Sequence, residues 1–557
     1  MGGAGIDATE LPTVSKLGRR TRGPGRMRAN AGMERRGHGR LAGGTLLGVL
    51  VGMLMLRHGR LVVDSDSVAQ QSVVQTWLHA GHDETYLPPN TWLLKLPVYF
   101  LIESLPVSPS TRLLLESLSL AAAGYLLMAW ACRWLAMEAG ATRRWTDAVL
   151  PLAWLATLGG GLGQYLSVMP NSRNIELGLS FLLLMVAGRY VAGEVPAGSS
   201  GSAWRQLGRY ASRGPVPVLL VAVLWVDDPY FAFLVGLPLL LACPVWYFAR
   251  SRDRRLLALA MAVAVSLLAI PVLRGLLAAG GVHVVPDATG PTFSPVDVTG
   301  HVPLLWPSLK AQLGLSEYGA GAAVAHALTV AVLFASVLAS GHLACRGWRA
   351  RNLVLTFVAV NWLVVVGGVL VNRTVYDFHA GRYLVLALFD LAVCLGVAMA
   401  GLRSRHPRWA SGIGALLLAA VLANGTAAVL GRPEEPLEAA RQASILSMLR
   451  AAGLNKGYAQ FWAANLYTYL SDGEVIVSDV SCRPGGRLRL RHWLTDTARL
   501  TVPAKRTFLL WDPIFRNCPP TRLEAQLGRP QAQLPGPAGT VILVYGHDLK
   551  DLLDQAP

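Results

Sequence analysis

The chain has 557 residues, of which 53% are hydrophobic and 15% are charged, and its formal net charge is +17. Soluble proteins carry roughly 25% charged residues, so the composition predicts an integral membrane protein. Nucleic acid is a poor candidate for a partner, because most arginines stand in short groups between apolar segments, as in cytoplasmic loops. The abundance of Ala, Gly, Arg and Leu is typical of a bacterial protein from a high-GC genome.

The N-terminal segment, residues 1–40, is polar and rich in glycine and arginine, which predicts a disordered cytoplasmic tail. The first membrane span is predicted over residues 41–63, and the basic tail holds its start on the cytoplasmic side. Asp64 and Asp66 follow this span directly, in the stretch LVVDSDSVAQQ, and so emerge on the outer face. Carboxylates are costly inside a bilayer, so this pair either contacts water or marks a functional site.

The first outer loop is predicted to contain two helices that lie on the membrane surface. Residues 64–80 have the pattern of an amphipathic helix. After the polar bend GHDETYLPPN, the apolar stretch 92–105 is too short to span, since a spanning helix needs about 20 residues. We therefore expect a second interfacial helix over this stretch.

The rest of the membrane part, 41–430, is predicted to hold about ten further spans, because long apolar segments alternate with short polar loops. Every arginine-rich loop falls on the cytoplasmic side, in agreement with the positive-inside rule. With about eleven spans in total, the segment after the last span lies outside the cytoplasm. The further spans are predicted over residues 110–131, 146–163, 175–193, 215–226, 229–248, 256–279, 321–343, 353–371, 383–402 and 409–430.

The C-terminal segment, residues 431–557, has the composition of a soluble protein and predicts a small extracytoplasmic α+β domain. Cys482 and Cys518 lie in it and could form a disulfide if this side of the membrane is oxidising. The aromatic residues of GYAQFWAANLYTYL suit either a domain core or the binding of sugar rings, and a core is the preferred interpretation. A helix is predicted over residues 436–453, and strands over 474–480, 506–511 and 540–545.

Charged residues also gather on the outer face, which is the less basic side of the membrane. Asp227 and Asp228 end the predicted span 215–226, so they occupy a helix end as Asp64 and Asp66 do. A solvated loop charge is the alternative interpretation of each. The cations on this face include Lys95, Arg173, Arg373 and Arg382.

These features together resemble the GT-C superfamily of membrane glycosyltransferases. The shared features are an acidic residue directly after the first span, two interfacial helices in the first outer loop, a second acidic motif in a later outer loop, and a soluble outer domain. The superfamily includes protein O-mannosyltransferases, lipid A aminoarabinose transferases and oligosaccharyltransferases. The resemblance implies a polyprenyl-phosphate-linked sugar donor and transfer to a lipid, glycan or protein acceptor on the outer face, with inversion at the anomeric carbon.

Inverting transfer needs a carboxylate that deprotonates or orients the acceptor hydroxyl. Asp64 matches the position of the catalytic residue in the family best, and Asp66 is its candidate partner. The leaving phosphate is already anionic, so it needs cations more than a general acid. Arginine suits this role because it can hold a phosphate with two parallel hydrogen bonds, although it can equally extend toward lipid head groups. The candidates are Arg173 and Arg382, followed by Lys95 and Arg373.

The paired Asp227 and Asp228 could instead hold Mg²⁺ or Mn²⁺ together with Asp64, since these ions prefer oxygen ligands. A reaction without metal is the open alternative. Glu176, just inside the span 175–193, is expected to pair with Arg173.

Two other functions are also considered. A flippase or transporter would place ionisable groups near the middle of the membrane. A polysaccharide polymerase or ligase would use the long outer loop 280–318, which contains His283 and His301 but no arginine. Both are weaker interpretations than a glycosyltransferase that uses a lipid-linked donor.

Overall fold

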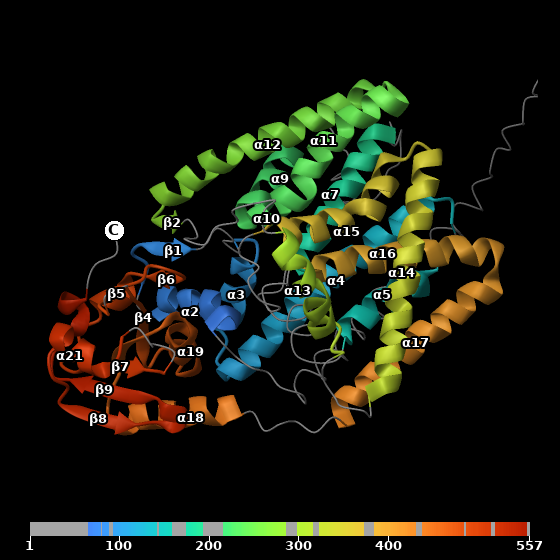
Figure 1. Cartoon of the computed structure of the whole chain (residues 1–557). Coiled ribbons are helices and arrows are strands. Elements are labelled where there is room, and N and C mark those ends of the chain that lie inside the picture. The colour runs from blue at the N-terminus through green and yellow to red at the C-terminus, as the bar shows by residue number, and fades with distance from the viewer. Residues whose placement is uncertain are drawn as a thin grey trace, which may run out of the picture.

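The structure is a computed structural model, and Figure 1 shows a bundle of long helices beside a smaller region that contains strands. Seven helices in the described residues are long and apolar enough to cross a membrane. They are α4 (Pro109–Glu138), α12 (Arg254–Ala279), α14 (Ala323–Arg349), α15 (Leu353–Val371), α16 (Val385–Arg405), α17 (Pro407–Leu430) and the run Ala232–Ser251, which contains α11 (Leu237–Trp246). The described residues are 65–79, 81–87, 93–141, 144–158, 174–192, 215–285, 298–315, 322–372, 384–430, 437–483, 486–513 and 518–553.

Three shorter helices complete the described part of the bundle, α5 (Trp145–Ala156), α7 (Asn174–Ala192) and α9 (Pro215–Asp227). Small residues let these helices approach their neighbours closely, as is common in membrane bundles. A Cβ atom added to Gly178 of α7 would lie only 2.9 Å from the carbonyl oxygen of Gly124 in α4. The predicted tail 1–40 and first span 41–63 lie outside the described residues.

Two arginines from loops that the sequence assigns to the cytoplasmic side bind the ends of neighbouring helices. Arg403, near the end of α16, donates 3.0 Å hydrogen bonds to Asp147, near the start of α5. Arg346, near the end of α14, donates to the carbonyl oxygen of Ala139, directly after α4.

The first predicted interfacial helix forms, and other parts of the chain cover it. Helix α2 (Ser65–His79) has buried side chains at every position from Val68 to Thr76. It packs between α3 (Leu96–Glu103) on one side and α19 (Phe461–Leu470) of the C-terminal region on the other. The sequence pattern of α2 alone does not reveal this second partner, because α19 lies far along the chain.

A three-stranded sheet joins three distant segments at the end of the bundle opposite the arginine-rich loops. Strand β1 (Thr85–Leu87) of the first loop pairs in parallel with β2 (Val282–Val284), which follows α12. It also pairs antiparallel with β6 (Thr495–Asp496) of the C-terminal region. The neighbouring labels in Figure 1 show this meeting point, which puts all three segments on one side of the bundle.

The segment 280–318, predicted as an outer loop, contains a helix that the sequence analysis did not expect, α13 (Val298–Gln312). Pro303 and Pro307 lie inside this helix, and proline normally indicates a helix end. The helix packs against α15, and Nδ1 of His301 hydrogen-bonds the carbonyl oxygen of Leu370 at 2.7 Å. Tertiary contacts therefore hold α13 in place despite its prolines.

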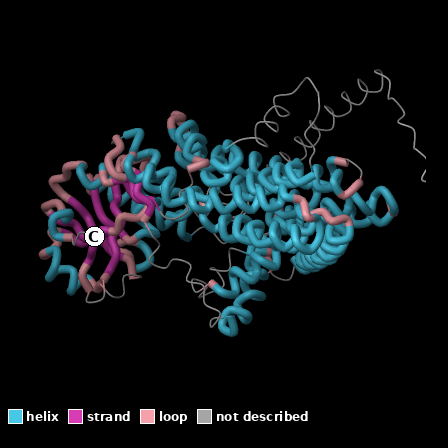
Figure 2. Tube along the Cα trace, turned by 90° about the horizontal axis from the view of Figure 1, so that it is seen from above, coloured by secondary structure: helices cyan, strands magenta, loops and turns pink. Residues whose placement is uncertain are grey.

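The C-terminal region (residues 437–553) forms a six-stranded sheet in the order β5-β4-β3-β7-β9-β8, which Figure 2 shows in magenta at one end of the molecule. Helix α18 (Leu437–Ala451) and the strands β4, β7 and β9 agree with the predicted helix and strands. The aromatic segment forms α19 and contributes mostly buried residues, as expected for a core, although Trp462 is exposed. The strands are β3 (Lys456–Ala459), β4 (Ile476–Cys482), β5 (Leu488–Leu490), β7 (Thr507–Trp511), β8 (Ala532–Pro535) and β9 (Val541–Tyr545).

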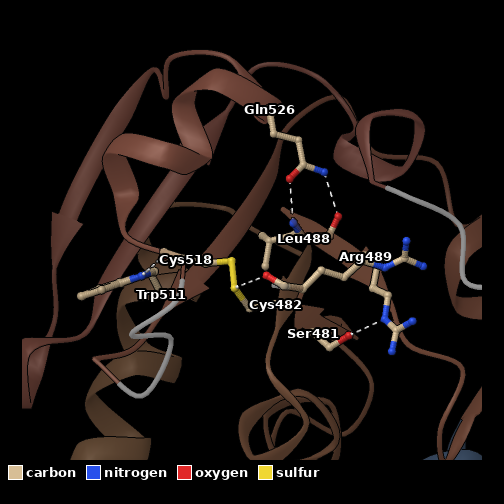
Figure 3. The surroundings of a disulfide bond; sticks show 8 residues. Ser481, Cys482, Leu488, Arg489, Trp511, Cys518 and Gln526 are labelled. Atoms are coloured by element: carbon tan, nitrogen blue, oxygen red, sulfur yellow. Dashed lines mark hydrogen bonds between the residues drawn. A yellow bond between two sulfur atoms is a disulfide. The ribbon is translucent and has the colours of Figure 1, made fainter. Parts of the chain in front are cut away.

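Cys482 and Cys518 form a disulfide, with Cα atoms 6.0 Å apart. Figure 3 shows that the bond joins the end of β4 to the segment before α21 (Pro520–Leu527). The side chain of Gln526 in α21 also bonds the backbone of Leu488 in both directions, at 2.7 and 2.8 Å. The edge of the sheet is therefore attached to α21 covalently and by hydrogen bonds.

Candidate active site

The structure describes the side chains of three of the predicted site residues, Lys95, Asp227 and Asp228. Asp66 lies in the first turn of α2, but its side chain is outside the described part. The remaining predicted site residues, Asp64, Arg173, Arg373 and Arg382, lie outside the described residues.

Lys95 forms a buried ion pair with Glu176, with 2.7 Å between Nζ and Oε1. Lys95 directly precedes α3, and Glu176 lies in the first turn of α7, where the helix dipole favours a carboxylate. The two side chains are 0% and 1% exposed, so solvent screens their attraction very little. The sequence offered no signal for this pair, because Lys95 belongs to the first outer loop and Glu176 lies just inside the predicted span 175–193.

Asp227 and Asp228 lie beside this ion pair. Asp227 ends α9, and its Oδ1 accepts a hydrogen bond from the backbone N–H of Leu94 at 3.1 Å. It interacts electrostatically with Glu176, Lys95 and Asp228. Lys95 and the adjacent pair Asp227 and Asp228, from two separate segments, therefore meet around Glu176. We call Lys95, Glu176, Asp227 and Asp228 the charged cluster.

The carboxylates of the charged cluster do not fit a metal site by themselves. One oxygen of Glu176 binds the Lys95 ammonium, and Oδ1 of Asp228 accepts the N–H of Tyr230 at 3.0 Å. Within the described ranges, no group of three or more His, Cys, Asp and Glu residues could hold a metal ion. Asp64, the third expected ligand, is outside those ranges.

A second polar cluster lies between α2, α3 and α4. The amide of Gln71 donates to Glu116 at 2.9 Å, and that of Gln75 donates to Glu103 at 3.0 Å. Burial raises the pKa of Glu103 to about 7, although Arg112 and Gln75 oppose this shift. Glu103 is therefore close to half protonated at neutral pH.

Tyr99 of α3 lies between the two clusters. Its side chain is fully buried and interacts electrostatically with Glu116 on one side and with Glu176 and Asp227 on the other. Burial and these carboxylates raise the pKa of Tyr99 well above its ordinary value. The phenol is therefore neutral and can donate a hydrogen bond.

The C-terminal region is hydrogen-bonded to α2 through one buried arginine, Arg499. Its guanidinium donates to the hydroxyls of Thr76 and Ser72 at 2.6 and 2.7 Å, and to the carbonyl oxygen of Ser72. Its remaining bond goes to Oδ1 of Asn465 in α19, at 2.8 Å. Sequence reasoning missed this residue, because nothing around it marks it as buried.

Two solved membrane enzymes are similar to this structure, and both are GT-C enzymes, the class that the sequence resembles. An oligosaccharyltransferase from Archaeoglobus fulgidus, in complex with zinc and sulfate, covers 84% of this chain and 68% of its own, with a TM-score of 0.42 and 11% identity. ArnT from Cupriavidus metallidurans, bound to undecaprenyl phosphate, covers 91% of this chain and 98% of its own, with a TM-score of 0.49 and 12% identity. No family model and no curated protein matches the sequence. Similarity at this level transfers no function to this chain.

Proposed function

We propose that the protein is a membrane glycosyltransferase that transfers a sugar from a polyprenyl-phosphate donor to a lipid, glycan or protein acceptor. The observation that carries this proposal is the charged cluster, which lies buried beside the first outer loop. Buried charges are costly, and in membrane proteins they commonly mark a functional site. The first turn of α2, which contains Asp66, belongs to the same loop.

In this proposal, Asp64 deprotonates or orients the acceptor hydroxyl, with Asp66 as its partner. The hydroxyl oxygen forms the new bond to the anomeric carbon as the bond to the phosphate oxygen breaks. The departing phosphate keeps that electron pair, so cations stabilise it. Arg173 and Arg382 are the proposed phosphate ligands, with Lys95 and Arg373 in support.

Asp227 and Glu176 have a supporting role in the proposal. The Lys95 ammonium is already bound to Glu176, and the N–H of Leu94, next to Lys95, is held by Asp227. These carboxylates therefore fix the start of α3 and the direction of Lys95. A phosphate that approaches Lys95 would share the ammonium with Glu176. Lys95 therefore adds little to the affinity for the donor, and its main role in the proposal is to orient the donor phosphate.

Transfer is proposed to occur on the outer face of a bacterial cytoplasmic membrane. The disulfide Cys482–Cys518 supports this placement of the C-terminal region, because disulfides persist mainly in oxidising compartments. Strand β6 of that region pairs with β1, so the first outer loop shares its side of the membrane.

The sidedness can be tested with sealed vesicles of both orientations that receive labelled polyprenyl-phosphate sugar. We expect label to leave the donor in right-side-out vesicles, where the C-terminal region faces the added donor. Transfer in inside-out vesicles alone would contradict the proposed side. Absence of transfer in both orientations, with the protein folded, would contradict the proposed function.

A further inference from the structure

Gln70 of α2 is a buried polar residue that the proposed function has not yet used. Its side chain is 2% exposed, and neither its amide nitrogen nor its amide oxygen has a hydrogen-bond partner in the described part of the chain. The neighbouring Gln71 and Gln75 differ, because their amides donate to Glu116 and Glu103. Buried polar groups are nearly always hydrogen-bonded, so an unpartnered carboxamide indicates a ligand-binding position.

Helix geometry places Gln70 on the same face of α2 as Val74, which packs toward α3. Residues one turn apart share a helix face, so Gln70 lies above Val74. Val74 packs in one apolar cluster with Tyr99 and Ile175. Tyr99 lies one turn after Lys95, and Ile175 directly precedes Glu176.

Gln70 also lies on the same helix as Asp66, the proposed partner of the catalytic base. Asp66 precedes Gln70 by one turn of the same helix, which corresponds to about 6 Å along its axis. Gln70 is therefore one turn from Asp66 and one turn from Val74. The apolar cluster of Val74 contains Tyr99 and Ile175, which are neighbours in the segments of the charged cluster. Oε2 of Glu176 likewise has no hydrogen-bond partner among the described residues.

We propose that Gln70 binds the sugar of the lipid-linked donor through hydrogen bonds to its hydroxyl groups. A sugar hydroxyl both donates and accepts, and a carboxamide offers an N–H₂ donor and a C=O acceptor to match it. The neighbouring ammonium and carboxylates suit the phosphate and the reacting hydroxyl, whereas the neutral amide suits the uncharged part of the donor. This inference rests on the proposed glycosyltransferase function and names a residue that determines which sugar is used.

The test uses Gln70→Leu, which removes the amide and nearly keeps the side-chain volume, and Gln71→Leu as a matched control on the same helix. We expect Gln70→Leu to lower kcat/KM for the polyprenyl-phosphate sugar by roughly 10- to 100-fold. The reason is that the sugar hydroxyl loses its hydrogen-bond partner in the binding site. Binding of polyprenyl phosphate without a sugar should stay within about twofold of wild type.

The Tm of the ligand-free proteins gives a second readout. Gln70→Leu should melt at or above the wild-type Tm, because it removes a buried group that has no partner. Gln71→Leu should melt lower, because it breaks the bond to Glu116.

Three results would overturn the assignment. They are wild-type kcat/KM in Gln70→Leu, an equal loss of affinity for polyprenyl phosphate without a sugar, and a fall in Tm as large as that of Gln71→Leu. A folded wild-type protein that neither binds nor consumes any polyprenyl-phosphate sugar would instead overturn the proposed function, and with it the assignment of Gln70 to the donor sugar.

Discussion

At the residue scale, the polar groups around α2 are held by partners from other parts of the chain. Glu103 is an example. It accepts a hydrogen bond from the amide of Gln75 in α2, and it forms an ion pair with Arg112 of α4 at 3.4 Å. Arg112 in turn binds Asp472 of the C-terminal region, and the hydroxyl of Tyr469 binds the carbonyl oxygen of Pro109. The protonation state of Glu103 therefore affects the contact between the bundle and the C-terminal region.

Stability should depend on pH through Glu103. Its pKa rises from 4.5 to about 7 on folding, so the folded state holds the proton more tightly than the unfolded state. The folded protein should accordingly lose stability as pH rises from about 4.5 to about 7, by on the order of 2 kcal/mol. Glu103→Gln stays neutral and should show a flatter profile of Tm against pH over this range.

Glu474→Gln is the control for this measurement, because Glu474 forms an exposed pair with Arg450. Its profile should follow that of the wild type. Parallel profiles for Glu103→Gln and the wild type would show that Glu103 is not the group that titrates.

Arg499→Ala should destabilise the protein by about 3 kcal/mol or more, because it leaves Thr76, Ser72 and Asn465 without their charged donor. The free energy of unfolding can be followed in detergent by the fluorescence of the many tryptophans. Arg522 of α21 is exposed, and Arg522→Ala should change the stability little. A loss in Arg499→Ala no larger than in this control would refute the structural role of Arg499.

At the element scale, hydropathy identified the long membrane helices well, and α15 begins and ends where the sequence predicted. The reason is that lipid contact imposes an apolar composition over a length that the bilayer fixes. The features that the sequence did not predict have a different origin. The burial of α2 and the helix α13 depend on contacts with segments far along the chain, and local composition does not record those contacts.

The disulfide between β4 and the segment before α21 provides a prediction at the same scale. The two cysteines are separated by 36 residues. Reduction should lower the free energy of unfolding by roughly 4 kcal/mol, because the unfolded chain gains conformational entropy when the cross-link is removed. Alkylation of the unreduced protein, followed by mass spectrometry, should leave Cys482 and Cys518 unmodified and label the exposed Cys345. Labelling of Cys482 without reductant would contradict the structure.

At the scale of the whole molecule, the fold brings Lys95, Asp227 and Asp228 together. Lys95, Asp227 and Asp228 could be selected from the sequence, because each is a charge beside apolar residues on the predicted outer face. The sequence did not indicate the roles of three other residues. These are Gln70, Glu176, which pairs with Lys95, and Arg499, which binds α2. Their roles depend on the packing of α7, α3 and the C-terminal region around α2, which only the folded chain defines.

The most direct test of the central claim measures release of polyprenyl phosphate from a labelled polyprenyl-phosphate sugar by the purified protein in liposomes, with bacterial envelope lipids and glycans as acceptors. The wild type should consume the donor, and Asp64→Asn should lose about 100-fold or more of the rate while it remains folded. Asp551→Asn, an exposed position in the C-terminal region, should match the wild type. Wild-type turnover by Asp64→Asn would contradict the assigned base, and no turnover by the folded wild-type protein with any donor would contradict the account as a whole.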